Sequence, residues 1–354
     1  ERSSKHTPKE APFLNIYSWF GNISPKILEQ FTQETGIQVH FDVYDSDQIL
    51  EAKMLAGNTG YDIVSPTVSP FFSRQLAVGL YQVIDKTKLS NLKHLDPRLL
   101  KVLQKVDPDN AYGVPLLWGT TGFGYNVEKV KEILPKEAPF NSLELVFNPT
   151  YVQKIAQCGF ELIDIPEDTI ESILVYLGYT YKDLDVENMK KVMSILRSIR
   201  PYVKRLNSSP DRAIEHLVSG ESCFVQSWSG EVLRAREEAV KSGRDIKIGY
   251  MVPKEHAAIW IDMLVIPKNA PHPENAHLFL DFIMRPEIAA ENMQHVMQAT
   301  ANKTAQELLP LHLQEDDILN PPLEIFNRFT IHAPLSVTQE RIQNRNWLLF
   351  KLRR

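Results

Sequence analysis

The first 64 residues alternate between strand-like and helix-like patterns, and this alternation restricts the fold more than any other feature. Residues 13–17 (FLNIY) are typical of a buried strand, and in residues 37–43 (IQVHFDV) apolar and polar side chains alternate, as in a half-buried strand. A helix is predicted between them. It starts at Ser24-Pro25, a capping residue followed by proline, and it stops at Gly36.

A second helix over residues 48–57 and a strand over residues 61–64 continue the pattern. Repeated β-α-β units predict an α/β fold in which helices flank a sheet. In open sheets of this kind, ligands bind beyond the carboxyl ends of the strands. Residues 19–22 (WFGN) and 65–67 (SPT) occupy those places.

Two extended stretches, residues 116–126 and 257–267, carry no helix signals and are predicted to cross between two lobes. A chain of 354 residues is long enough for about two domains. Each lobe is expected to be a sheet flanked by helices. The expected lobes are residues 11–118 plus 247–305, and residues 119–246 plus 306–354, with a ligand cleft between them. Further elements are predicted as helices over 142–156, 166–177, 187–205 and 209–220, and a strand over 222–226.

The composition excludes two classes of protein. The net charge is −5, which gives no basic face for nucleic acid, so no nucleic-acid partner is expected. No apolar run approaches the roughly 20 residues that a membrane span needs. The chain begins at Glu1 with a polar stretch and no Met, which suggests that a signal peptide has been removed.

Enzyme and metal motifs are missing from the sequence. It contains no G-x-S-x-G elbow, P-loop, dinucleotide fingerprint or H-E-x-x-H pair, so no catalytic residue, cofactor or metal is predicted. The two cysteines, Cys158 and Cys223, have no metal-site spacing. From the residues alone they are either two buried thiols or a disulfide.

Aromatic and acidic residues, together with one threonine, lie near predicted strand ends and crossings. They are Trp19, Thr67, Asp168, Trp228, Glu231, Trp260 and Asp262. Taken singly, a Trp is usually part of a core, and an acid in the first turn of a helix usually complements the helix dipole. Asp262 is the exception, because it interrupts the apolar run 259–265 without a neighbouring Lys or Arg. A buried carboxylate is costly unless a partner compensates it.

Carboxylates together with Trp rings predict a site for an organic cation. Each carboxylate offers an ammonium group charge-assisted hydrogen bonds worth about 1.5–3 kcal/mol. The rings cover methylene groups and add about 0.5–2 kcal/mol of cation–π attraction. A metal ion would require acids without the rings. An alkyl diamine or polyamine fits this combination.

On longer stretches the chain resembles the bacterial periplasmic polyamine (spermidine/putrescine)-binding proteins that serve ABC importers. The similar segments include GYDIVSP, WGTTGFGYNVEKV, CGFELIDIPED, SWSGEV and TANKTA, and the resemblance covers roughly residues 13–350. It implies a two-lobed type II binding-protein fold with two hinge crossings, a periplasmic location and a monomer. It also implies that Cys158 and Cys223 form a disulfide bond, as in the putrescine-binding members.

The resemblance assigns ligand contacts to the seven residues above and to Gln298, which takes the place of a Tyr. Trp260 corresponds to Phe in the putrescine binder and to Trp in spermidine binders, which favours a triamine. Phe20, Gly21 and Asn22 replace the family's usual polar residue, acid and Tyr. Near the C-terminus, Leu335 aligns with a polar residue of the family. The first lobe is therefore expected to lack a carboxylate that binds one terminal ammonium.

The expected function is a solute-binding protein that holds a polyamine, with spermidine or norspermidine favoured, and presents it to a membrane ABC permease. The alternative is a periplasmic sensor that docks on the periplasmic domain of a membrane signalling receptor. An enzyme on the same scaffold is the remote alternative, since no nucleophile–base pair is evident.

Overall fold

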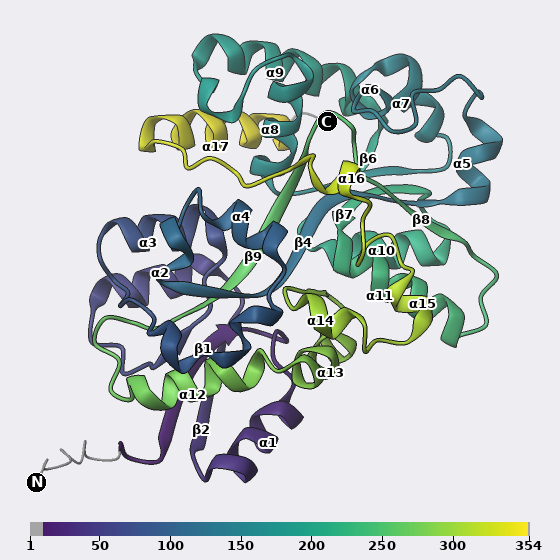
Figure 1. Cartoon of the computed structure of the whole chain (residues 1–354). Helices are drawn as coiled ribbons and strands as arrows, with labels where there is room; N and C mark the ends of the chain where they lie inside the picture. The colour runs from purple at the N-terminus through teal and green to yellow at the C-terminus, as the bar shows by residue number, and fades with distance from the viewer. Residues whose placement is uncertain (1–9, 353–354) are drawn as a thin grey trace, which may run out of the picture. The chain divides into compact units, whose positions relative to one another are not determined.

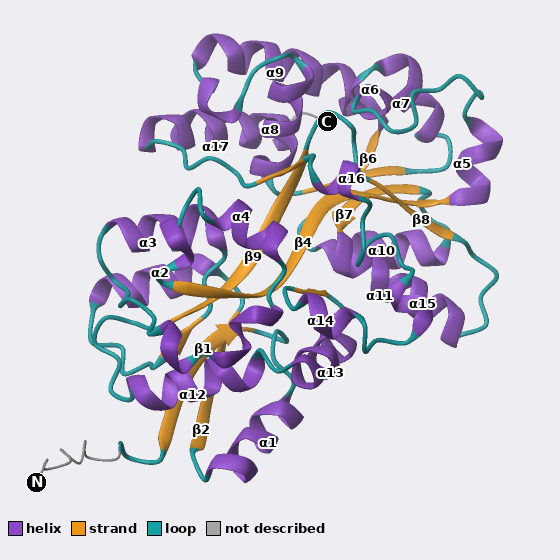
Figure 2. Ribbon diagram, viewed as in Figure 1, coloured by secondary structure: helices purple, strands orange, loops and turns teal. Residues whose placement is uncertain are grey.

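The computed structural model describes residues 10–352, which form two compact α/β units, each built from separate parts of the chain (Figures 1 and 2). Most of the polar N-terminal stretch falls on residues 1–9, outside the described residues. Of the described residues, the first unit contains 10–118, 261–296 and 300–314. The second contains 119–260, 297–299 and 315–352.

The sheet of the first unit confirms the predicted β-α-β alternation. Its strand order is β2 (Gln38–Tyr44), β1 (Phe13–Trp19), β3 (Ile63–Val64) and then β9 (Ala257–Val265). Strand β1 runs parallel to β2 and β3, whereas β3 and β9 are antiparallel. The carboxyl ends of β1, β2 and β3 therefore lie at one edge of this sheet.

Helices join these strands as the sequence predicts. Helix α1 (Pro25–Thr35) begins after Ser24 and ends at Gly36, whose φ of 76° is accessible to glycine without steric cost. Helix α2 (Asp47–Ala56) follows β2. The remaining helices of this unit are α3 (Ser73–Ala77), α4 (Pro97–Leu103), α12 (Pro273–Ile283), α13 (Pro286–Val296), α14 (Lys303–Gln306) and α15 (Leu311–Gln314).

The second unit has its own sheet, in the order β4 (Gly113–Asn126), β7 (Phe224–Trp228), β5 (Phe160–Ile163) and β6 (Val203–Asn207). Strand β7 is antiparallel to β4 and parallel to β5. Strand β8 (Ile248–Met251) pairs with β4, and strand β11 (Phe329–Thr330) pairs with β9. The helices are α5 (Val127–Ile133), α6 (Glu144–Phe147), α7 (Pro149–Ile155), α8 (Pro166–Tyr176), α9 (Val186–Ile199), α10 (Pro210–Ser219), α11 (Ser229–Lys241), α16 (Leu323–Phe326) and α17 (Val337–Leu352).

Strands β4 and β9 are the two predicted crossings, and each runs from one unit into the other. The chain also crosses on either side of residues 297–299, beside β10 (Ala299–Thr300), and again after Gln314. The units differ from the expected lobes because residues 247–260 and 297–299 belong to the second unit and 306–314 to the first. Pairing of β8 with the second half of β4 explains the first of these differences.

Two predicted helices are shorter than expected. The helix expected over 187–205 ends at Ile199, because Pro201 cannot donate a helical hydrogen bond, and residues 203–207 form β6 instead. The helix expected over 142–156 is divided in two. Asn148 accepts a hydrogen bond from the backbone N–H of Thr150 and starts α7 anew.

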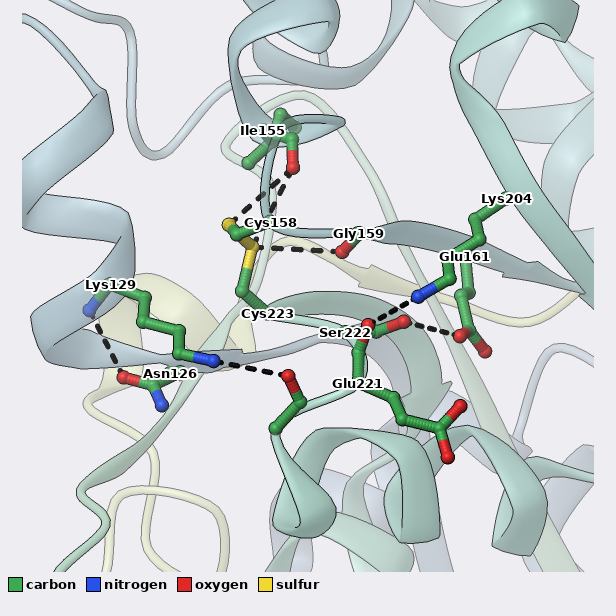
Figure 3. The surroundings of a disulfide bond; sticks show 11 residues. Asn126, Lys129, Ile155, Cys158, Gly159, Glu161, Lys204, Glu221, Ser222 and Cys223 are labelled. Carbon is green, nitrogen blue, oxygen red and sulfur yellow. Dashed lines mark hydrogen bonds between the residues drawn. A yellow bond between two sulfur atoms is a disulfide. The ribbon is translucent and has the colours of Figure 1, made fainter.

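A disulfide bond joins Cys158 to Cys223, which confirms the pairing implied by the family resemblance. Cys158 follows α7, Cys223 precedes β7, and their Cα atoms are 5.4 Å apart. Figure 3 shows the sulfur atoms beside the carbonyl groups of Ile155 and Gly159. The bond closes a segment of 65 residues within the second unit, including β5 and β6.

Removing this bond is expected to destabilise the second unit. In the chain-entropy model, a loop of this length corresponds to about 4 kcal/mol. The double variant Cys158→Ala/Cys223→Ala should therefore unfold at lower urea concentration than the wild type, when each is followed by circular dichroism. Reduction of the wild type should produce a similar loss and leave the double variant unaffected. Equal midpoints for all samples would contradict the expectation.

Candidate ligand site

A pair of buried carboxylates lies at the strand ends of the first unit. Asp262 is on β9, and Asp47 is the first residue of α2, just after β2. Thr67 connects them, because its backbone N–H donates to Asp47 Oδ1 and its hydroxyl to Asp262 Oδ1, both at 3.3 Å. A backbone bridge between Thr67 and Asp262 holds this arrangement in register. We call Asp47 and Asp262 the first-unit acid pair.

Asn22 supplies a neutral partner to this acid pair. Its Nδ2 donates to Asp262 Oδ2 at 2.8 Å, and its backbone carbonyl accepts a hydrogen bond from Asn292 Nδ2 at 2.9 Å. Asn292 Oδ1 in turn accepts from the backbone N–H of Ser24, which fixes the start of α1. Among residues 10–352, no Lys, Arg or His forms an ion pair with either carboxylate of the acid pair.

Burial without a cation changes how these two acids titrate. Burial, and to a smaller extent the charge of Asp47, raises the pKa of Asp262 to about 7, although the hydrogen bonds from Asn22 and Thr67 act in the opposite direction. Burial raises the pKa of Asp47 to about 6, although Thr67 opposes this. A bound ammonium group would stabilise both ionised forms, so the acid pair favours a cation.

Asp47 was missed by the sequence reasoning, which expected this lobe to lack one carboxylate. The available signal was its position just after the half-buried strand that became β2.

The three residues that replace the family's usual polar residue, acid and Tyr have different environments in the structure. Phe20 is 77% exposed, Gly21 turns the chain with a φ of 80°, and Asn22 is buried on Asp262.

Trp19 lies where the sequence predicts it, at the end of β1. Its ring centroid is 5.3 Å from that of Tyr44, at the end of β2. Trp19 therefore belongs to the same edge of the first sheet as Thr67 and Asp47, which follow β3 and β2.

In the second unit, two predicted aromatic residues come together. Trp228 ends β7, Trp260 lies on β9, and their ring centroids are 6.2 Å apart. A side chain at Gly119 would collide with the Trp260 ring, so this glycine makes room for it. Together the two rings form an aromatic surface that can cover methylene groups.

Glu231 lies in the first turn of α11, three residues after Trp228, and is buried. Its Oε1 forms an ion pair with Arg234 on the next turn of the same helix. Arg234 Nη2 also lies 3.6 Å from Asp211 Oδ1. The carboxylate that was predicted to hold an amine therefore already has a cation from its own helix.

Asp168 also has a cation of the chain beside it. His332, which follows β11, places Nε2 3.0 Å from Asp168 Oδ1 and Nδ1 against Glu171 Oε2. Both acids are on α8 and are buried. Burial lowers the pKa of His332, but the hydrogen bonds that its ring donates to the two carboxylates outweigh this effect and raise the pKa to about 10. His332 is therefore an imidazolium at neutral pH, and no local sequence pattern indicated its role.

Gln298 and Leu335 differ in their surroundings. A Cβ at Gly230 would lie 2.9 Å from Gln298 Cγ, so Gln298 packs against the start of α11. Within residues 10–352, the buried Oε1 of Gln298 and the buried Nε1 of Trp260 have no hydrogen-bond partner. Leu335 packs against the apolar core of the second unit, as a leucine would.

The predicted residues therefore fall into separate groups. In the first unit, Thr67 and Asp262 are in contact, and Trp19 is at the same edge of the sheet. In the second unit, Trp228 contacts Trp260. Within residues 10–352, no group of three or more His, Cys, Asp or Glu side chains is arranged as a metal site.

This architecture, two α/β units joined by extended crossings, is that of a type II periplasmic binding protein. Residues 26–319 match the family model of the bacterial extracellular solute-binding proteins. The chain therefore belongs to this family, whose members bind solutes and are not enzymes, and within it to the polyamine-binding ABC-transporter type.

Known relatives cover almost the whole chain. The chain is 38% identical to the putrescine-binding periplasmic protein of Pseudomonas aeruginosa over 96% of its own length and 91% of the relative's. It is 35% identical to the putrescine-binding periplasmic protein of Escherichia coli, over 97% and 92%. A crystal structure of the spermidine/putrescine transporter substrate-binding protein of Streptococcus pneumoniae superposes with a TM-score of 0.82 at 27% identity, covering 96% of this chain and 98% of that one. No helix in the described chain is long and apolar enough to span a membrane.

The raised pKa of Asp262 predicts a pH-dependent contribution to stability. Its folded-state pKa of about 7 exceeds the unfolded value of about 4. The stabilising contribution is therefore complete below pH 4 and is lost as the pH rises through 7. The free energy of unfolding of Asp262→Asn, measured relative to that of the wild type, should therefore increase by roughly 2–4 kcal/mol as the pH is raised from 4 to 8.

Urea unfolding of both proteins across this pH range would measure the difference. Asp45→Asn removes one acid from an exposed position nearby and serves as the control for net charge. A stability difference between wild type and Asp262→Asn that is independent of pH would contradict the interpretation of a buried, uncompensated carboxylate.

Proposed function

We propose that this protein is a periplasmic solute-binding protein that binds a polyamine and presents it to an ABC permease. The observation that carries the proposal is the first-unit acid pair, two buried carboxylates without a cation in the described chain. An ammonium group is the cation that such acids and the nearby rings suit, because its alkyl chain needs apolar contacts and a metal ion does not.

Several observations support this proposal. The relatives named above are putrescine-binding proteins and the substrate-binding protein of a spermidine/putrescine transporter. The aromatic surface of Trp228 and Trp260 suits the methylene groups of a polyamine. We further propose that the polyamine is a triamine such as spermidine or norspermidine, because Trp260 beside Trp228 offers a wide aromatic surface. The disulfide bond suits an oxidising compartment such as the periplasm.

Calorimetric titration of ligand-stripped protein with putrescine, spermidine, norspermidine and spermine tests the proposal. Binding of at least one polyamine is expected. Asp47→Asn and Asp262→Asn should each weaken it at least about 10-fold, the effect of losing one ionic hydrogen bond. Asp45→Asn, at an exposed position, should leave the affinity unchanged. No binding heat and no thermal shift with any of the four amines would refute the proposal.

Binding should also depend on pH. Because Asp47 and Asp262 have raised pKa values of about 6 and 7, protons compete with an ammonium group for both carboxylates. Affinity should therefore fall as the pH is lowered from 8 to 5, and binding at pH 6.5 should release protons. Titrations in buffers of different ionisation enthalpy measure this release, and an observed enthalpy that is the same in all buffers would contradict it.

A second candidate function is a polyamine sensor that docks on the periplasmic domain of a membrane receptor. The specific observation in its favour is Phe20, a large apolar side chain that is 77% exposed immediately after Trp19. Pull-down against permease and receptor domains distinguishes the two. Capture by the receptor domain that is lost with Phe20→Ser would favour sensing, and capture by the permease alone would favour import.

A further inference from the structure

One edge of the sheet in the first unit is open. Strand β2 (Gln38–Tyr44) is the last strand in the strand order, and within residues 10–352 it pairs only with β1 (Figure 2). Its seven residues are continuous in register with β1 and include no proline. A strand of this length at an open edge presents unpaired backbone N–H and C=O groups to another chain.

Two hydrogen bonds at the ends of β2 show which of its residues face this edge. The backbone N–H of Gln38 donates to the carbonyl of Pro12 at 2.8 Å. The carbonyl of Tyr44 accepts from the backbone N–H of Phe20 at 2.9 Å. Because the backbone groups of a strand alternate in direction, every second residue from Gln38 to Tyr44 faces β1, and the residues between them face outward. The outward residues are Val39, Phe41 and Val43.

The sequence of β2 is complementary to itself in the antiparallel direction. When two copies are centred on Phe41, each Phe41 lies opposite the other, and Val39 lies opposite Val43. These are the residues whose backbone groups face outward, so the residues of each pair can exchange two hydrogen bonds. His40 then lies opposite Asp42, at the positions where facing side chains are closer together.

The side chains that would meet are available for this pairing. His40 and Asp42 are both exposed, and within the described chain neither ring nitrogen of His40 has a hydrogen-bond partner. Asp42 Oδ2 accepts from the hydroxyl of Tyr61 at 2.7 Å, which holds the carboxylate in place. An imidazole N–H can donate to such a carboxylate in either tautomer. Val43 is 47% exposed, so a second strand would remove apolar surface from water.

The terminal strand of the second unit differs from β2 in this respect. Strand β6 carries Lys204 and Arg205 in its middle. Lysine on a terminal strand opposes pairing with another chain, as do proline and bulges. Strand β2 has none of these three features. A strand from another protein would need the matching order of apolar and charged residues, whereas a second copy of β2 supplies that order itself.

We propose that β2 is a dimer interface, in which β2 of one chain pairs antiparallel with β2 of a second copy, centred on Phe41. The first-unit sheets of the two copies then form one continuous sheet. Because each copy contributes a single strand, the interface is small and the dimer is weak. The interface uses neither acid of the first-unit acid pair, so it goes beyond the proposed ligand binding and does not depend on it. It replaces the monomer that the family resemblance implies.

Sedimentation velocity of the full chain tests this, from about 10 µM to about 1 mM, the range in which a small interface associates. A reversible monomer–dimer equilibrium is expected. Val43→Lys places a cation on the edge and should raise the dissociation constant at least about 10-fold. Val78→Lys is the matched control, because Val78 is a 63% exposed valine after α3, and it should keep the wild-type constant.

A chain that stays monomeric up to the highest concentration would overturn the proposal. An equal dissociation constant for Val43→Lys and the wild type would also overturn it. Phe41→Pro keeps the hydrogen bonds between β2 and β1, because the N–H that it removes faces outward, and it should abolish the dimer. Thermal unfolding of each variant verifies that the chain is folded.

Exchanging the charged pair tests the register. His40→Glu places carboxylates opposite one another across the interface and should weaken the dimer at least about 5-fold. The double variant His40→Glu/Asp42→His exchanges the two groups, so each again meets its complement in the antiparallel register, and it should restore most of the affinity. Damage to the fold of one chain would not be reversed in this way. A double variant that dimerises no better than His40→Glu would overturn the pairing centred on Phe41.

Discussion

The burial of Asp47 and Asp262 without a cation is the constraint on which the interpretation of the molecule depends. Burial raises the pKa of both carboxylates, and the charge of Asp47 adds to the rise at Asp262, so the two ionised acids oppose the folding of the unit that contains them. The backbone bridge between Thr67 and Asp262 holds the acids in place despite this cost. The proposed function accounts for this cost, since a cationic ligand bound to the acid pair would remove it.

Charge is compensated differently in the second unit. There the acids on α8 and α11 have His332 and Arg234 as partners, so the stability of that unit does not require a ligand cation. The first-unit acid pair has no such partner among residues 10–352, so the two units differ in how their buried acids are compensated.

The fold was predictable from the sequence to a large extent because its signals are local. The helix stop at Gly36, the proline after Ser24 and the alternation in β2 each depend on a few neighbouring residues. The errors also have local causes. Pro201 ended a helix that periodicity alone extended to residue 205, and Asn148 with Pro149 divided another. The type of fold was confirmed, whereas the expected lobe boundaries differ from the two units, at residues 247–260 because strand β8 pairs with β4.

The sequence by itself determined which residues break the expected pattern, and Asp262 within an apolar strand is the clearest example. It also carried the family resemblance, which correctly implied the disulfide bond. Only the tertiary structure decided which groups compensate the buried charges. Asp47 meets Asp262 through Thr67, and His332 reaches Asp168 across 164 positions of the chain. Partners so far apart in sequence leave no periodic signal, because their contact follows from how strands and helices pack and not from local conformational preference.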